Sequence, residues 1–247
     1  MIARLNISPG ICSTSDKDGT TILHIEQDKI YSVIGLGSMI WAKLAASING
    51  LATTDLIAEV SSTFKDVPRR QIERDVECLL VSLKQKGLVE ATREVGRPHH
   101  SLRDSICSAT WFLARRASAW LLKFRLYGFV AFLELGTINL MLKAIGFGAV
   151  YRMVKGWPVT PKPVPPNVQQ QICEAVDKAT SWYPRQAMCL QRSATTTCLL
   201  RQQGLSAEMV IGCRKIPFKA HAWVEVDGKV VNDKRQVQEF YSVLERC

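Results

Sequence analysis

The chain has few histidines and no cysteine pattern of the kind that holds a metal. Four histidines and eight cysteines are scattered over 247 residues, with no Cys-x-x-Cys pair and no Cys/His cluster. This scatter argues against a zinc site and against a disulfide framework. Scattered thiols favour a reducing compartment, so we expect a cytoplasmic protein. His99 and His100 are adjacent, but without partners at ligand spacing we interpret them as linker residues.

Uncharged hydrophobic runs of membrane-spanning length are also absent. The stretch "LYGFVAFLELGTINLMLKAIGFGAVY" (126–151) is apolar, but Glu134 and Lys143 interrupt it, and a span needs roughly 18–20 apolar residues. We therefore expect two buried helices and no membrane association. A hairpin attached to a membrane surface is the alternative, because four basic residues lie between 115 and 125. The opening "MIARLNISPG" lacks the apolar core of a signal peptide.

The first 98 residues of the chain carry no excess of positive charge. The formal net charge is +10, yet residues 1–98 hold 12 basic and 12 acidic side chains. Residues 99–155 hold 8 and 2, and residues 156–247 hold 12 and 8. A nucleic-acid-binding domain needs a basic surface. The balance therefore disfavours a DNA-reading domain at the N-terminus, and we expect no nucleic-acid partner.

Hydrophobic periodicity predicts a small N-terminal module of two strands and three short helices. The segment "TTILHIEQDKIYSVI" (20–34) predicts two strands around a polar turn at 26–29, because apolar residues alternate on each side. The helices are predicted over residues 36–47, 53–64 and 68–87. Pro68 is a favourable first helical residue, and Gly87 is a helix stop. We expect a compact, winged-helix-like module.

Two Pro- or Gly-containing stretches divide the chain. "REVGRPHHSLRDS" (93–105) is typical of a linker, and "GWPVTPKPVPP" (156–166) is expected to run extended over the surface. We therefore predict one domain at 1–95, a linker at 96–105, and a second domain at 106–247 that opens with a helical segment.

Cys189 is the cysteine best placed for chemistry. The segment "RQAMCLQRSATTTCLLRQQG" (185–204) predicts a helix with Cys189 in its first turn. A helix N-terminus lowers the pKa of a thiol, because unsatisfied N–H groups and the helix dipole favour the thiolate. No charge falls between Arg192 and Arg201, which indicates a buried helix. Cys198 lies in its interior and is expected to be a core residue.

Strand register decides whether His221 can meet Asp233. The last strands are predicted over residues 207–214, 220–226 and 229–233. A two-residue turn at Asp227–Gly228 would place Asp233 on the face opposite His221. A three-residue loop, 226–228, sets His221 directly against Asp233 and gives a favourable cross-strand pair at each opposed position. We predict the three-residue loop.

Cys189, His221 and Asp233 then have the order and chemistry of thiol catalysis. Opposed side chains have Cβ atoms about 4.5–5.5 Å apart, so Asp233 can orient the imidazole of His221. His221 can in turn accept the proton of Cys189. Taken singly, the alternatives are a satisfied core histidine and a turn-forming aspartate. The ordered set of three favours catalysis.

The N-terminal module resembles a known recognition element. "GSMIWAKLAASINGLATTDLIAEVSSTFKDVPRRQIERDVECLLVSLKQKGLV" is similar to the PqqD-like precursor-recognition element of peptide-modifying systems, with its "DV..LL..L...GL" third helix. In that family a disordered leader peptide adds as a strand to the sheet edge and packs against the third helix. The resemblance implies a leader groove lined by Ile30, Tyr31, Ser32, Val33, Asp75 and Cys78. Decoration of a solvated helix face is the alternative for Asp75.

The remainder of the chain resembles a peptidase. "CLQRSATTTCLLRQQGLSAEMVIGCRKIPFKAHAWVEVDGKVVND" is similar to the leader peptidase, or B protein, of lasso-peptide biosynthesis, from about residue 106 to the end. The resemblance implies a transglutaminase- or papain-like cysteine-protease fold with an antiparallel sheet, and hence an α+β chain. The family's Cys, His and Asp correspond to Cys189, His221 and Asp233. A fused recognition module matches the single-chain form of the B protein.

The resemblance also implies a function and partners. The module would bind the leader of a ribosomally made precursor, and the peptidase would cut between leader and core. The core amine would pass to a separate, asparagine-synthetase-like lasso cyclase that uses ATP; the chain itself would need no cofactor. A main-chain N–H at the helix start would hold the oxyanion, and Gln186 is a side chain near it in sequence.

Two other classes of function use the same features. An acyltransferase or transglutaminase would share the triad, because an amine can resolve the thioester in place of water. A non-catalytic leader-binding chaperone would need only residues 1–92, and Cys189 would then be dispensable.

Overall fold

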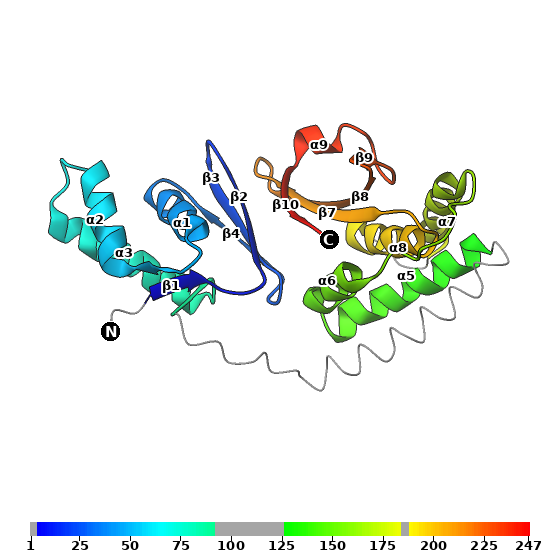
Figure 1. Ribbon diagram of the computed structural model, residues 1–247, viewed down its shortest axis with the longest axis horizontal. Helices are drawn as coiled ribbons and strands as arrows, with labels where there is room; N and C mark the ends of the chain where they lie inside the picture. The colour runs from blue at the N-terminus through cyan, green and yellow to red at the C-terminus, as the bar shows by residue number, and fades with distance from the viewer. Residues whose placement is uncertain (1–3, 92–125, 184–187) are drawn as a thin grey trace. The chain divides into compact units, whose positions relative to one another are not determined.

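The computed structural model describes three stretches of the chain, residues 4–91, 126–183 and 188–247 (Figure 1). Several sequence predictions lie outside these residues: the linker at 96–105, the histidine pair within it, the first part of the helical segment (106–125) and Gln186. The described residues divide into two compact units. The first holds residues up to Ala91, apart from the turn 25–28, and the second holds residues from Leu126 onward.

The first unit combines short strands with three helices. The strands are β1 (Arg4–Ile7), β2 (Ile11–Asp16), β3 (Gly19–His24), β4 (Lys29–Val33), β5 (Leu51–Ala52) and β6 (Val89–Ala91). The helices are α1 (Leu36–Ala46), α2 (Thr53–Thr63) and α3 (Arg69–Gln85). The strands form two sheets, ordered β5-β1-β6 and β2-β3-β4. The predicted strand pair is present as β3 and β4, and the three predicted helices are α1, α2 and α3.

The sequence prediction was wrong about the start of α3 and incomplete in its strands. Pro68 is the N-cap of α3 with an extended ψ of 132°, so Arg69 is the first helical residue. The periodicity also missed β1, β2 and β5. β1 and β5 are too short for an alternating pattern to stand out, and β2 has the mostly polar sequence "ICSTSD".

One hydrophobic core joins α1, α2 and α3 to strands of the first unit. Its fully buried members include Leu5, Ile22, Ile40, Trp41, Leu44, Leu56, Val60, Val76 and Leu88. Polar contacts attach β2 and β3 to α1. The indole of Trp41 donates to the hydroxyl of Ser13 over 3.0 Å, and the hydroxyls of Thr20 and Ser38 lie 2.6 Å apart.

The second unit packs helices against one antiparallel sheet. The helices are α5 (Tyr127–Ala144), α6 (Phe147–Gly156), α7 (Val168–Trp182), α8 (Cys189–Gln202) and α9 (Val237–Phe240). The strands are β7 (Ala207–Arg214), β8 (Lys219–Val226), β9 (Lys229–Val230) and β10 (Ser242–Arg246), in the order β10-β7-β8-β9. Mixed helix and antiparallel sheet in both units confirm the predicted α+β class.

Helix α8 is the central helix of this unit. Every residue from Ser193 to Gln202 is buried, Cys198 included, so the predicted burial is confirmed. Leu199 and Leu200 share a core with Val224 of β8. The helix ends where the guanidinium of buried Arg201 donates to the backbone carbonyls of Val154, Trp157 and Ala207. These contacts fix the helix that begins at Cys189.

The apolar stretch 126–151 forms two helices, α5 and α6, as predicted, but α5 is buried on one face only. It packs against α7 and α8 through buried residues that include Val130 and Leu135. Phe129, Leu133 and Leu140 are exposed. Apolar residues on all sides of α5 gave no sign in the sequence of which face would pack. In the described part of the chain, no helix is long and apolar enough to cross a membrane.

The predicted register of the last hairpin was wrong. Val226 pairs with Lys229 and Glu225 with Val230, so the turn has two residues, Asp227 and Gly228. Both have positive φ, 50° and 72°, which is the type I′ geometry that matches the twist of a hairpin and that Asp-Gly favours. The regular strand β9 ends at Val230, and one further ladder bond follows, from the N–H of Val231 to the carbonyl of Val224.

Candidate active site

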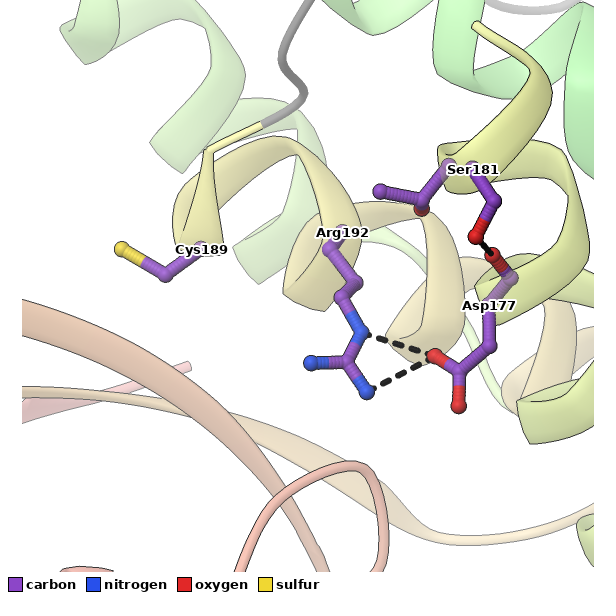
Figure 2. A pocket seen from close by; sticks show the side chains of 5 residues that line it. Asp177, Ser181, Cys189 and Arg192 are labelled. Carbon is purple, nitrogen blue, oxygen red and sulfur yellow. Dashed lines mark hydrogen bonds and ion pairs between the residues drawn. The ribbon is translucent and has the colours of Figure 1, made fainter.

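Cys189 stands at the N-terminus of α8. Met188, its N-cap, is extended with a ψ of 169°, so the chain enters the helix abruptly at Cys189. Figure 2 shows the thiol projecting from this first turn. The first N–H groups of a helix have no partner within it, and they favour negative charge nearby. The predicted placement of Cys189 in the first turn is confirmed.

His221 lies in β8 and meets Asp233 despite the changed register. The imidazole Nε2 and the carboxylate Oδ2 of Asp233 are 2.7 Å apart. The other carboxylate oxygen accepts the backbone N–H of Lys234 over 2.7 Å. Because Nε2 is occupied by Asp233, Nδ1 is the ring nitrogen left for the hydrogen bond between His221 and Cys189. The structure thus brings the three predicted residues together.

The surroundings of Cys189 favour its thiolate. Burial by itself would raise the pKa of the Cys189 thiol, but hydrogen bonds from His221 and from the backbone of Ala222 and Leu190 outweigh it, and the pKa is lowered. The hydrogen bond with Cys189 in turn raises the pKa of His221 against its partial burial, with help from Asp233. The two shifts together favour a thiolate–imidazolium pair.

Two aromatic rings flank the imidazole. The ring centroid of Tyr241 lies 5.1 Å from that of His221, and the ring of Trp223 lies 6.3 Å away at an interplanar angle of 24°. Trp223 and Tyr241 also contact one another. Trp223 follows His221 by two positions on β8 and therefore shares its face of the sheet. The rings limit how the imidazole can turn.

A buried carboxylate, that of Glu225, accepts a hydrogen bond from the indole of Trp223. It is 1% exposed and accepts hydrogen bonds from the Trp223 indole (2.7 Å), the Gln238 amide (2.8 Å) and the Arg246 guanidinium (2.6 Å). Burial acts to raise the pKa of Glu225, but Arg246 and the other two donors outweigh it and lower the pKa. Sequence reasoning missed this network, although Trp223 and Glu225 share the face of His221 at a spacing of two.

A cavity of about 370 Å³ opens beside the thiol. Its lining residues are Asp177, Thr180, Ser181, Cys189 and Arg192 (Figure 2). The Arg192 guanidinium donates to the Asp177 carboxylate from Nε over 2.9 Å, and its second nitrogen lies 2.7 Å from the same oxygen. The cavity therefore opens beside Cys189 on the side of α7. No sequence motif marks α7 as a wall of this cavity, so sequence reasoning missed it.

The predicted leader-groove residues lie on one sheet edge and one helix of the first unit. In the described chain β4, which carries Ile30, Tyr31, Ser32 and Val33, is an edge strand of the sheet β2-β3-β4. Asp75 and Cys78 are exposed on α3.

Gly37 of α1 joins the two elements of this predicted groove. An added Cβ on Gly37 would lie 3.5 Å from Val33 of β4 and 3.8 Å from Leu79 of α3. The edge strand and α3 therefore approach each other closely at this point.

Among the residues that the structure describes, no group of three or more His, Cys, Asp or Glu side chains could hold a metal ion.

Comparison with known proteins identifies two domain families. Residues 19–89 match the family model described as coenzyme PQQ synthesis protein D (PqqD). Residues 138–246 match the model of the transglutaminase-like superfamily. The first match covers β3 to β6, and the second covers Cys189, His221 and Asp233.

Two individual proteins are similar to parts of the chain. The "Microcin J25-processing protein McjB" of Escherichia coli is 39% identical over 56 residues, which are 23% of this chain and 27% of that protein. The solved structure "TbiB1 in Complex with the TbiA(beta) Leader Peptide" is 25% identical, covers 36% of this chain and 99% of its own, and has a TM-score of 0.32. The chain therefore joins a PqqD-type domain to a transglutaminase-like domain, and the resemblance to lasso-peptide B proteins is confirmed.

Proposed function

We propose that this chain is a leader peptidase of lasso-peptide maturation. Its PqqD-type domain binds the leader of a ribosomally made precursor, and its transglutaminase-like domain cuts between leader and core. The observation that supports this most is the contact of Cys189, His221 and Asp233, with the thiol pKa lowered and the imidazole pKa raised. The name of the Escherichia coli relative, a processing protein for microcin J25, supports the same role.

The geometry suits a two-step thiol mechanism. The Cys189 thiolate adds to the scissile carbonyl, and the C–N bond breaks as the His221 imidazolium gives its proton to the leaving amine of the core. In the second step His221 takes a proton from water as the water oxygen adds to the thioester carbonyl. The C–S bond then breaks, which restores the Cys189 thiolate beside the imidazolium, and the leader departs as a carboxylic acid that loses its proton to solvent. Asp233 holds the imidazole throughout. Backbone N–H groups at the start of α8 are placed to receive the oxyanion.

Leader binding would use the edge of β4. An extended peptide can add there as a further strand, with backbone hydrogen bonds providing affinity and alternate side chains providing selectivity. Tyr31 and Val33 are half-buried in the core of the first unit, and Lys86 lies over the ring of Tyr31 at 5.4 Å from its centroid. Side chains of β4 therefore anchor the strand to the core of the first unit, while its outer backbone edge forms the end of the sheet β2-β3-β4.

The freed core amine would pass to a separate ATP-using, asparagine-synthetase-like cyclase, which joins it to a side-chain carboxylate. No cofactor is assigned to this chain, because thiol hydrolysis needs only the three side chains and water. A complex with the cyclase belongs to the same proposal.

Mass spectrometry of the precursor tests the function directly. The precursor is incubated with cyclase and ATP and with the wild-type chain, the Cys189→Ala variant or the Cys173→Ala variant. Cys173 is a matched control, because it lies on α7 outside the site and burial raises its pKa to about 11. We expect free leader with wild type and Cys173→Ala, and intact precursor with Cys189→Ala.

Other products would identify the alternatives. A new isopeptide bond made without the cyclase would mean a transferase, because an amine rather than water would have resolved the thioester. Precursor bound and left whole by the wild type would mean a leader-binding chaperone. Leader release by the Cys189→Ala variant would refute Cys189 as the nucleophile. Either result would refute the proposed peptidase.

A further inference from the structure

The strand pairing that continues from β9 ends where the side chain of Asn232 takes over a backbone hydrogen bond. Val231 still donates its N–H to the carbonyl of Val224 over 3.0 Å. In a regular antiparallel pair the N–H of Val224 would return a bond to the carbonyl of Val231. It donates instead to the side-chain Oδ1 of Asn232 over 2.7 Å. The amide of Asn232 thus takes the place of a backbone carbonyl, and the chain turns off the ladder at this residue.

This replacement decides where Asp233 lies. The pairs Val226–Lys229 and Glu225–Val230, continued as a regular ladder, would set Asp233 opposite Ala222. A residue opposite Ala222 shares the face of Ala222, and neighbouring residues point to opposite faces of a sheet. Asp233 would then be on the wrong face for His221. Its 2.7 Å contact with His221 therefore depends on the departure from the ladder at Asn232.

The same amide also reaches the helix of the nucleophile. Asn232 Nδ2 donates to the hydroxyl of Ser193 over 3.0 Å, and that hydroxyl donates to the carbonyl of Ala222 over 2.9 Å. Ser193 lies one helical turn after Cys189 on α8 and is fully buried, and Asn232 is 6% exposed. Hydrogen bonds in such a dry setting hold their groups firmly, because breaking one leaves an unpaired polar atom.

We propose that Asn232, together with Ser193, is a positioning residue that fixes the segment carrying Asp233 to both the nucleophile helix and the histidine strand. It touches no substrate and acts only through Asp233 and His221. The inference rests on the proposed thiol catalysis. It adds a residue that neither the motif nor strand pairing indicates.

The test uses the pH dependence of Cys189 alkylation by iodoacetamide, followed by peptide mass spectrometry. This measurement needs no precursor. Asn232→Ala should move the midpoint of Cys189 alkylation to higher pH and lower the rate at pH 7 by roughly tenfold, the change in thiolate fraction that one pKa unit gives. Ser193→Ala, a smaller change that keeps the bond to Val224, should move the midpoint in the same direction by less. Thr196→Val is the control, because it removes a buried hydroxyl of α8 that bonds only to Arg192 of its own helix.

A double variant separates positioning from general loss of stability. If Asn232 acts through Asp233, Asn232→Ala should cause no further shift of the midpoint in an Asp233→Ala background. The thermal midpoints of Asn232→Ala, Ser193→Ala and Thr196→Val are measured in parallel. Lowered thermal midpoints with an unchanged alkylation profile in Asn232→Ala and Ser193→Ala would overturn the inference. If Asn232→Ala does not fold, an unchanged profile in Ser193→Ala overturns it alone.

Failure of the role proposed for Asn232 and failure of the proposed peptidase activity give different results. Leader release by Cys189→Ala refutes the peptidase, whatever the alkylation profiles are. Unchanged alkylation profiles with Cys189-dependent cleavage refute only the role of Asn232.

Discussion

At the scale of single residues, the environment of each cysteine decides its chemistry. Burial raises the pKa of Cys173 to about 11 and that of Cys247 to about 12, and it raises the pKa of Cys198 well above the ordinary value. Cys189 is also partly buried, but His221 and two backbone donors reverse the effect. Of these four thiols, Cys189 is the one that is prepared to act as a nucleophile near neutral pH.

We expect His221 to be the main cause of the lowered pKa of Cys189. Loss of the imidazole in His221→Ala leaves the burial of Cys189 in place and removes its main hydrogen-bond donor, so the thiol pKa should rise. The pH midpoint of Cys189 alkylation should therefore move upward, with the rate at pH 7 reduced by at least about tenfold. Peptide-resolved mass spectrometry measures the rate for each cysteine separately. Equal Cys189 profiles in wild type and His221→Ala would show that the imidazole does not activate the thiol.

At the scale of secondary-structure elements, the last hairpin shows how far a sequence predicts a site. The positions of Cys189 on a helix start and His221 on a strand followed from periodicity and turn residues. The register did not, because cross-strand pairing favoured the three-residue loop at each opposed position, whereas the Asp-Gly turn geometry determined the actual pairing. Contact between His221 and Asp233 was predicted for the wrong reason. Its actual cause, a side-chain amide in place of a backbone carbonyl, leaves no periodic trace in a sequence.

The type I′ turn gives a prediction about stability. Gly228 has a φ of 72° and open space around its Cα, so Gly228→Ala meets no atoms and suffers only backbone strain. The free energy of unfolding should fall by about 1–2 kcal/mol. Gly128→Ala is the matched control, because Gly128 is a helical glycine of α5 with equally open space. That substitution should raise the free energy of unfolding by about 0.4–1 kcal/mol. Urea titrations of both variants check the difference in sign.

The edge of β4 gives a prediction about the leader. If the leader adds as a strand, only alternate backbone N–H groups point toward β4. Methylation of single backbone nitrogens along a leader peptide should then weaken binding at every second position, by roughly three- to tenfold for each lost hydrogen bond. Fluorescence anisotropy of labelled peptides measures the affinities. A uniform effect along the peptide, or none, would exclude strand addition.

At the scale of the whole molecule, a PqqD-type domain and a transglutaminase-like domain share one chain. Under the proposed function, a leader bound to the first domain would keep the cleavage site near Cys189, at an effective concentration on the order of millimolar for a short flexible linker. The effect requires only the covalent connection between the two units. The sequence predicts a two-domain organisation, because charge balance, Pro/Gly content and periodicity all change along the chain.

Cutting the connection should separate recognition from chemistry. A protease site is inserted in the predicted linker, 96–105, and cleaved after purification. At micromolar enzyme, kcat/KM for the full precursor should fall by at least about tenfold, because the tether no longer concentrates the cleavage site. Cleavage of a short peptide that lacks the leader should be unchanged. Steady-state kinetics with both substrates measure the effect, and an equal loss for both would indicate damage to the peptidase rather than loss of tethering.

The place of β1 in its sheet has a consequence for how the first unit is made. β1 comes first in the chain, yet it is the middle strand of β5-β1-β6. Its partners are separated from it by α1 on one side and by all three helices on the other. During synthesis β1 must therefore wait for β5 to leave the ribosome before it has a first partner, and for β6 before it has a second. Such long-range pairing slows folding. A fragment that begins after β1 would leave β5 and β6 without the strand that joins them.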